Sequence, residues 1–414
     1  MPARLTGASR SDLLWLTVSR IRARGFMPIV NRIAALHDEV TAWRRDFHEH
    51  PELQFEVHRT AGIVADKLKE FGCDKVVTGI GRTGVVGIIK GSKSTSGRVI
   101  GLRADMDALP LDEISGKPHA SKTPGKMHAC GHDGHTAMLL GAAKYLAETR
   151  NFDGTVAVIF QPAEEGGGGA REMVDDGLMD RFGIQEVYGM HNGPGLPVGT
   201  FALRPGPLMA AADGIRIEVE GKGGHAAQPH NSIDTVLVAS QIVANIQSIA
   251  SRNVDPLEHV VVSVCTFNAG FAENVIPQNA VLTGTVRTLS EAVRDVTEKR
   301  LHAIVEGTAA LFGATAKLTY RRGAPVTANH AAEAGFAGDA AAAVVGEAAV
   351  NRAVTPVMGA EDFAFMLNAR PGAFIFIGQG DGPQVHHPAY DFNDEIIPLG
   401  MSYWARLVET RLPA

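Results

Sequence analysis

Residues 127–135 read Met-His-Ala-Cys-Gly-His-Asp-Gly-His and bring three imidazoles, a thiol and a carboxylate into one short stretch. Histidine and cysteine are the usual protein ligands of borderline-soft divalent metals, and the two glycines let the backbone turn tightly enough to aim Cys130 and His132 at one point. The Cys-x-His spacing matches no standard zinc-finger pattern, so a histidine-rich polar loop is the alternative interpretation. The rest of the chain has to decide between the two.

Apolar patterns predict that strands and helices alternate on either side of this stretch. The strands are predicted at 84–90, 98–103, 155–160 and 186–190, and the helices at 29–50, 60–71 and 136–149. This alternation predicts an α/β fold with a mostly parallel sheet covered by helices on both faces. Several polar residues fall just beyond the carboxyl ends of these strands, the edge where open α/β sheets bind ligands: Asp105, Asp107, Glu164, Glu165 and His191.

These strand ends carry the donors for a metal-dependent reaction. Cys130, His132, Glu165 and His191, with a histidine from the pair His386-His387, can hold two divalent ions a few ångströms apart, which activate water and polarise a carbonyl. Glu164 and Glu165 are adjacent and point apart, so one can bind metal while Glu164 accepts a proton. The alternative for Cys130 is a small buried thiol at the start of a helix. The alternative for Glu164 and Glu165 is a pair of charges at the surface.

The pattern changes between residues 213 and 323. Strands at 215–219, 260–267, 281–287 and 316–320 and helices at 233–249 and 290–312 follow in the order β-α-β-β-α-β, which is typical of a ferredoxin-like unit. Helices and strands alternate again after residue 324. The predicted organisation is a catalytic metal-binding domain in two parts, 27–212 and 324–414, with an inserted lid or dimerisation domain at 213–323 and an extension of uncertain order at 1–26.

The composition limits the classes of partner that the chain is expected to bind. The net charge of −6 and the lack of a basic stripe argue against nucleic-acid binding. A helix needs about 20 apolar residues to span a bilayer, and no apolar run in the sequence approaches that length. Small molecules are therefore the expected partners. The three cysteines form no disulfide framework, which favours a reducing cytoplasm.

The segment 213–323 offers further polar candidates. His225 lies in a glycine-rich turn and is either structural or a donor to the oxyanion that forms when water attacks a carbonyl. Asn274 and Arg287 can bind a substrate carboxylate, for which Arg321 and Arg322 compete. A second set of residues is apolar and can line either an acyl pocket or the core: Leu208, Met209 and Phe363.

Together, the motifs resemble the N-acyl-amino-acid amidohydrolases of the hippurate hydrolase and indole-acetyl-amino-acid hydrolase type, a branch of the dinuclear metallopeptidases. The resemblance runs from about residue 29 to the C-terminus, through motifs at 103–110, 127–135, 161–169, 223–230, 359–365 and 386–394. It implies that the metal ligands are Cys130, His132, Glu165, His191 and His386. The wider clan has a histidine where this chain has Asp105, which leaves open whether Asp105 contacts metal.

The resemblance also implies the activity. Its reaction is hydrolysis of an N-acyl amino acid, preferably a hippurate-like aroyl-glycine, with two ions of zinc or manganese and with Glu164 as general base. Asp107 is expected to orient a ligand, and His225, Asn274 and Arg287 to shape the oxyanion and carboxylate site. In relatives the histidine of the inserted domain reaches the partner subunit, so a homodimer is implied. An N-acetyl-amino-acid deacetylase or a dipeptidase is the enzymatic alternative, and a metal-containing binding protein is the non-enzymatic one.

Overall fold

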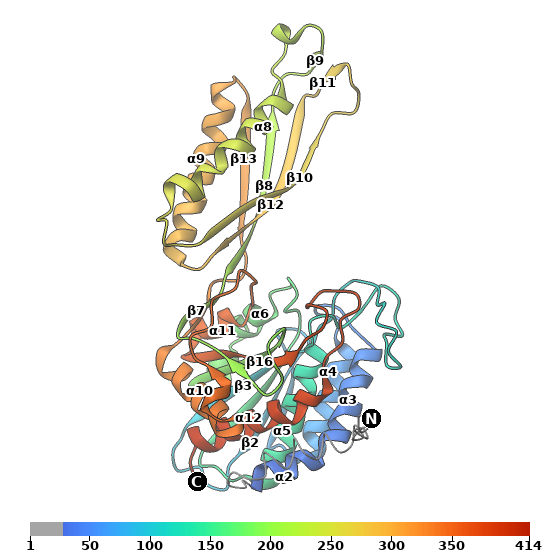
Figure 1. The fold of residues 1–414 in the computed structure, drawn as a ribbon, viewed down its shortest axis with the longest axis vertical. Helices are drawn as coiled ribbons and strands as arrows, with labels where there is room; N and C mark the ends of the chain where they lie inside the picture. The colour runs from blue at the N-terminus through green and yellow to red at the C-terminus, as the bar shows by residue number, and fades with distance from the viewer. Residues whose placement is uncertain (1–27) are drawn as a thin grey trace, which may run out of the picture.

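The computed structural model describes residues 28–414, so the extension predicted at residues 1–26 lies outside the described residues. Figure 1 shows two units stacked along the long axis, with the first and last helices described, 28–35 and 397–411, in the lower unit and the middle of the chain in the upper one. None of the helices within 28–414 is both long and apolar enough to cross a membrane.

The lower unit is built on an eight-stranded sheet. In spatial order its strands are β1 (Lys75–Ile80), β2 (Gly84–Lys90), β4 (Thr155–Gln161), β3 (Val99–Asp105), β5 (Glu186–Pro194), β16 (Gly372–Gly380), β6 (Phe201–Ala202) and β15 (Val350–Asn351). The central strands β4, β3, β5 and β16 are parallel to their neighbours within this group. The sheet is mixed rather than parallel throughout, because β2 runs antiparallel to β1 and β4, and β6 runs antiparallel to β16.

Helices cover both faces of this sheet. One face carries α2 (Pro28–Ala35), α3 (His37–Glu49), α4 (His58–Glu70), α5 (His132–Thr149), α10 (Ala331–Val345) and α12 (Ile397–Arg411), and the other carries α6 (Gly169–Asp175), α7 (Leu178–Arg181) and α11 (Ala364–Ala369). Strand β4 shows why two layers are needed: Val156 and Val158 pack into the first core, and Ala157 and Ile159 between and after them into the second.

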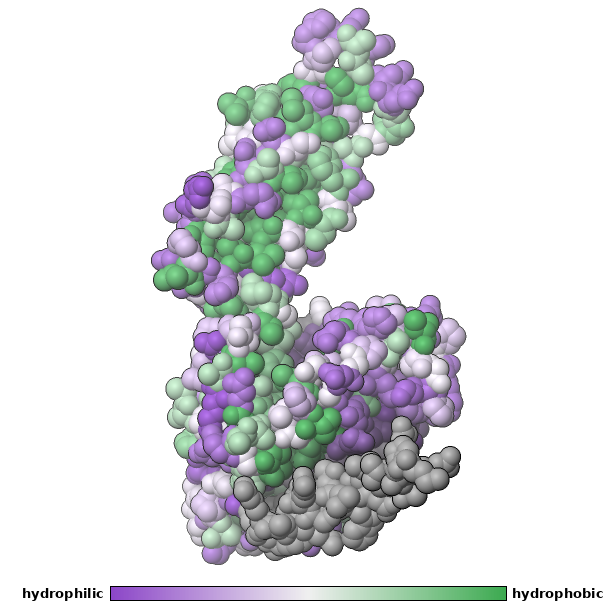
Figure 2. Space-filling view, in the orientation of Figure 1, coloured by the Kyte–Doolittle hydropathy of each residue, from purple (hydrophilic) through white to green (hydrophobic). Residues whose placement is uncertain are grey.

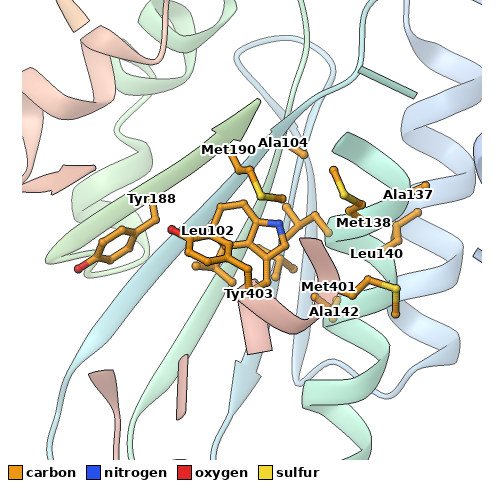
Figure 3. Packing of buried hydrophobic residues seen from close by; sticks show 14 of the residues in the cluster. Leu102, Ala104, Ala137, Met138, Leu140, Ala142, Tyr188, Met190, Met401 and Tyr403 are labelled. Atoms are coloured by element: carbon orange, nitrogen blue, oxygen red, sulfur yellow. The ribbon is translucent and has the colours of Figure 1, made fainter. Parts of the chain in front are cut away.

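Helix α5 positions the chemistry-bearing stretch. Nearly all of its residues are buried, as expected of a helix enclosed by other elements rather than lying at a surface. Thr136 of this helix donates to the carbonyl of Asp105, the last residue of β3, at 2.7 Å. Met138 and Leu140 belong to the same buried cluster as Leu102 of β3 and Met401 of α12 (Figure 3). The first turn of α5 is thereby fixed at the carboxyl end of β3.

The upper unit contains β8 (Ala211–Glu220), α8 (Thr235–Ile246), β10 (Val260–Ala269), β12 (Asn279–Thr288), α9 (Glu291–Leu311) and β13 (Thr315–Arg322). This is the β-α-β-β-α-β order that the sequence predicts, and the strands pair antiparallel in the order β10-β12-β8-β13. Asp234 and Ser290 cap the two helices by accepting backbone amides of their first turns. Two small ribbons complete the fold: β9 (Gly224–His225) with β11 (Val275–Ile276), and β7 (Gly206–Met209) with β14 (Thr327–Asn329).

Element boundaries differ from the predictions in places that matter for the site. Helix α5 begins at His132 instead of residue 136, which puts His132 on its first turn. Strand β5 continues to Pro194, so His191 lies within a strand and not beyond its end. The helix predicted at 29–50 is divided at Leu36, and β1 was not predicted because half of its residues are exposed.

Gly134, on the first turn of α5, should tolerate no side chain. A Cβ there would lie 2.2 Å from Cε2 of the buried Phe392 ring. We expect Gly134→Ala to lower the free energy of unfolding by about 1–3 kcal/mol because the packed core has to give way. Gly335→Ala in α10 is the matched control, since no atom lies within 4 Å of its added Cβ. The control should be neutral or stabilising by up to about 1 kcal/mol. Equal unfolding free energies for the two variants in chemical denaturation would contradict the packing argument.

Candidate metal centre

The structure brings all five predicted metal ligands together at the carboxyl edge of the central strands. The donor atoms of Cys130, His132 and His191 lie within 4.8 Å of one another, and so do those of Cys130, Glu165 and His386. Cys130 belongs to both groups, which places its sulfur between them; this thiol lies 3.4 Å from Nε2 of His191. The ligands come from the start of α5, the loop after β4, the strand β5 and the loop after β16.

Unusual backbone conformations hold these ligands in place. Gly131, between Cys130 and His132, has φ 95°, and a Cβ there would lie 2.2 Å from Oδ1 of Asn192, so only glycine fits. His386 has φ 68°, and its amide donates to the carbonyl of Ala129 at 2.6 Å. Left-handed non-glycine residues cost energy and persist where the surroundings enforce them. The stretch at 127–135 is thus tied directly to the C-terminal loop.

Hydrogen bonds fix which imidazole nitrogen faces the centre. Nδ1 of His132 lies 2.8 Å from the carbonyl oxygen of Asp107, and Nδ1 of His191 lies 2.7 Å from that of Asn192. A carbonyl oxygen can only accept, so each Nδ1 carries the proton. Each Nε2 is then left with a lone pair that points toward the other ligands, as metal-binding histidines require.

The donor set fits divalent metal ions. Nε2 of His132 is buried and has no hydrogen-bond partner among the described residues, which is costly unless a cation occupies its lone pair. The buried Oε1 of Glu165 lies 3.3 Å from Nε2 of His386. Burial raises the pKa of the Cys130 thiol well above its usual range. A thiol in such a place becomes a thiolate only next to a cation. Imidazole, carboxylate and thiolate together suit zinc or manganese.

Asp107 joins two loops of the centre. Its carboxylate accepts the backbone amides of Glu164 and Glu165 at 2.9 and 3.1 Å, while its carbonyl oxygen accepts Nδ1 of His132. The imidazole of His132 is therefore oriented mainly by the backbone carbonyl of Asp107, because the carboxylate oxygen lies 3.5 Å from the imidazole nitrogen. The carboxylate instead shapes the loop that carries both glutamates.

Glu164 stands beside the ligands without joining their two groups. One of its oxygens lies 4.0 Å from Nε2 of His132. The other accepts the backbone amide of Asp362 at 3.4 Å. Burial, followed by the charges of Glu361 and Asp362, raises the pKa of Glu164 well above its usual range. A carboxylate with a raised pKa next to a metal centre is suited to accept and return a proton.

Arg103, Glu361 and Asp362 form a buried ion cluster that the sequence reasoning did not identify. Arg103 is 1% exposed and donates to Glu361 at 2.9 Å, to Asp362 at 3.3 Å and to Asp105 at 2.7 Å. Burial acts to lower the pKa of Arg103, but the charges of Glu361 and Asp105 raise it, so the guanidinium stays charged. The available signal was an arginine inside an apolar strand followed by an acidic pair in the motif at 359–365, because a buried arginine requires carboxylate partners.

Asp105 has little capacity left for metal. One oxygen accepts from Arg103 at 2.7 Å and the other from Nδ1 of His135 at 2.7 Å, and its shortest approach to Nε2 of His132 is 3.8 Å. His135 in turn contacts Asn192, which follows His191 in β5. These partners support a positioning function for Asp105 and His135 behind the centre.

The predicted substrate residues do not lie at the centre of their own chain. His225 is exposed and pairs with Val275 in the ribbon that also carries Asn274, at the end of the upper unit farthest from α5 (Figure 1). Arg287 lies near the opposite end of β12, opposite Ala212, and its guanidinium donates to Thr285 of its own strand. The apolar residues considered for an acyl pocket, Leu208, Met209 and Phe363, belong to the core.

Comparisons with known proteins agree with this geometry. Residues 101–410 match the model of Peptidase family M20/M25/M40, and the chain belongs to this family. It is 43% identical to a hippurate hydrolase of Campylobacter jejuni over 381 residues, covering 92% of this chain and 98% of that protein. It is 41% identical to an N-acetylcysteine deacetylase of Bacillus subtilis, covering 90% and 97%. The solved YXEP protein of Bacillus subtilis, described as a dinuclear metal binding peptidase, superposes with a TM-score of 0.80 at 36% identity, covering 92% of this chain and 99% of that one.

Asp107→Asn should weaken metal binding without unfolding the chain. An amide offers one acceptor oxygen in place of two, so it would oppose an N–H group to the amide of Glu164 or Glu165 and displace their loop. We expect metal affinity to fall about 10–100-fold. Metal per chain after dialysis against increasing chelator measures this. Asp66→Asn on the exposed side of α4 is the control, and an identical chelator midpoint for both variants would show that Asp107 does not support the centre.

Proposed function

We propose that this member of Peptidase family M20/M25/M40 hydrolyses the amide bond of N-acyl amino acids to a carboxylic acid and a free amino acid. The observation that carries the proposal is the convergence of five metal-type donors with Glu164 beside them. The proposed ligands are Cys130, His132, Glu165, His191 and His386, and they would hold two divalent ions of zinc or manganese. The ions supply Lewis acidity, which activates water and polarises the amide carbonyl.

The remaining chemistry belongs to the side chains. Glu164 accepts a proton from the attacking water as the new carbon–oxygen bond forms. It then donates this proton to the amide nitrogen as the carbon–nitrogen bond breaks, so the amino acid leaves as a neutral amine. The crowding of Glu164 by Glu361 and Asp362 favours the protonated form that this second step needs. Asp107 keeps Glu164 and the ligand Glu165 in fixed relative positions.

The preferred substrates in this proposal are hippurate-like aroyl-glycines. The hippurate hydrolase relative supports this choice, and the N-acetylcysteine deacetylase relative supports the alternative of N-acetyl amino acids. Turnover of benzoyl-glycine, N-acetyl amino acids and dipeptides by the same preparation separates these possibilities. Brisk deacetylation without hydrolysis of benzoyl-glycine would reject the preferred class. A cytoplasmic location stays a prediction from the three cysteines.

We further propose that the segment 213–323 is an inserted domain through which the chain forms a homodimer. Asn279 and Arg287 are separated by eight residues of β12, or about 26 Å at about 3.3 Å per residue, so the ribbon with His225 and Asn274 and the end with Arg287 cannot reach one substrate in a single extended chain. A second copy can supply the ribbon to the metal centre of the first. Such a site would be shared between subunits.

Exposed apolar side chains on the upper unit support the proposed dimer. Figure 2 shows hydrophobic side chains over much of the visible face of this unit. Val236 and Leu237 on α8 are 40% and 48% exposed, and Phe267 on the edge strand β10 is 41% exposed. An edge strand with unpaired backbone groups beside exposed apolar side chains is suited to pairing with its own copy.

Glu164→Ala tests the general base and also the binding-protein alternative. Removing one carboxylate from a cluster held by a single arginine relieves repulsion, so the fold and the metal ligands should be retained. We expect kcat for benzoyl-glycine to fall at least about 100-fold with unchanged metal content. The control is Glu333→Ala in the first turn of α10, a partly exposed site. Unchanged turnover by Glu164→Ala would refute the assignment.

Mixing two inactive variants tests the shared site. Glu164→Ala and His225→Ala dimers, exchanged by dilution and reassembly, should yield hybrids in which one site combines an intact Glu164 with an intact His225 from the other subunit. About a quarter of wild-type activity is expected at equal amounts. His230→Ala, at an exposed neighbouring histidine, should be active without mixing. Mass measurement first has to demonstrate that the subunits have exchanged. If activity is not recovered after that exchange, His225 lies outside the partner's site.

A further inference from the structure

A cavity beside the metal centre has no function in the mechanism above. It has a volume of about 450 Å³ and is bounded by the ligand Glu165 on one side. Four apolar residues supply part of its wall: Leu53, Phe55, Ala108 and Pro110. This volume lies within the range of small-molecule sites, and the mixture of apolar walls with a few polar groups is typical of them.

The wall of the cavity is fixed to the loops that carry the catalytic groups. The amide of Ala108, next to Asp107, donates to the carbonyl of Glu52 at 2.8 Å. The amide of Ala163, next to Glu164, donates to the carbonyl of Gln54 at 3.1 Å. A group bound in the cavity would therefore be held at a constant position relative to the metal centre, as substrate positioning requires.

Backbone strain is concentrated at the same place. Gln54 and Arg82, which both line the cavity, have φ values of 48° and 75° although neither is glycine. Ala163 and His386, which flank or belong to the metal centre, share this left-handed conformation. Among residues 28–414 the only other case is Arg150. Strained residues are retained where the surroundings enforce them, most often at binding and catalytic sites.

Phe55 presents a supported aromatic surface. The guanidinium of Arg82 lies 4.0 Å from the centroid of its ring, and Thr83 donates to its backbone carbonyl at 2.9 Å. Gly167 approaches the edge of the ring so closely that a Cβ would lie 3.3 Å from Cε2. The ring is thus held in one orientation before any ligand binds, which lowers the entropy cost of packing an apolar group against it.

The charge of the cavity decides which end of the substrate it accepts. Arg82 is already paired with Glu172 at 2.5 Å, and Glu56 adds a carboxylate that no metal ligand role would neutralise. The lining therefore carries an excess of negative charge, which repels a free carboxylate. An N-acyl amino acid has one charged end and one uncharged end, so the uncharged acyl end is the part that fits.

We propose that this cavity is the acyl-binding site and that it selects N-acyl amino acids with a large uncharged acyl group, aromatic groups in particular. The inference rests on the proposed amidohydrolase function. Phe55 supplies the packing surface, and Glu56 disfavours acyl groups that end in a carboxylate.

Phe55→Ala tests the packing surface. We expect the ratio of kcat/KM for benzoyl-glycine to that for acetyl-glycine to fall about 10-fold or more, because acetyl-glycine lacks the ring that Phe55 contacts. Phe312→Ala, at an exposed phenylalanine after α9, should leave this ratio unchanged. Metal content and thermal unfolding confirm that each variant is folded. An equal loss on both substrates would overturn the acyl-site assignment.

Glu56→Lys tests the charge argument at an exposed residue whose replacement does not threaten folding. The native chain should prefer butanoyl-glycine to succinyl-glycine, and Glu56→Lys should reduce this preference about threefold or more. Glu70→Lys, at an exposed position of α4, carries the same charge change and should have no such effect. Equal effects of the two lysines would overturn the inference. No turnover of any N-acyl amino acid would reject the proposed function and the inference with it, whereas normal turnover with unchanged selectivity would reject the inference alone.

Discussion

The buried guanidinium of Arg103 is the constraint on which the catalytic edge depends. Four carboxylates, those of Asp105, Glu164, Glu361 and Asp362, gather at the end of β3, and such a group would separate or take up protons without a compensating charge. Arg103 contacts three of them directly. Because these partners come from β3 and from the segment before α11, the ion cluster also joins distant parts of the chain at the point where the metal ligands meet.

Backbone polar groups extend this constraint to the ligands. Asp107 uses its carboxylate for the loop with Glu164 and Glu165 and its carbonyl for His132, so one residue sets the spacing between the base and two ligands. The amide of His386 donates to the carbonyl of Ala129 and so connects the C-terminal loop to the stretch at 127–135. The amides of Glu164 and His386 donate at 2.9 and 2.6 Å, and loss of either bond would leave its acceptor without this partner. The centre is therefore pre-formed by the protein and does not depend on the ions alone.

Sequence reasoning selected candidate ligands that come together in the fold, because metal chemistry restricts residue types and because parallel strands bring their carboxyl ends together. It identified Cys130, His132, Glu165, His191 and His386, and the structure places their donor atoms in two overlapping groups. It could not find the partners of Arg103, since pairing between β3 and residues 361–362 depends on tertiary packing that no local pattern encodes. The distance between His225 and the centre was equally inaccessible, because periodicity indicates a strand but not the direction in which a whole unit extends.

The separation of the upper unit from the metal centre divides substrate recognition into two parts. The lower unit carries the candidate metal centre and the cavity beside it, whereas the carboxylate-binding candidates lie on the upper unit and its distant ribbon. A change of side chain at Leu53 or Phe55 can then alter the cavity while its links to the catalytic loops persist, because Ala108 and Ala163 donate to the backbone carbonyls of Glu52 and Gln54. Related proteins that are named for benzoyl and acetyl substrates would accordingly differ at the wall and share the ligands, since side-chain replacement there leaves the backbone hydrogen bonds to Ala108 and Ala163 intact.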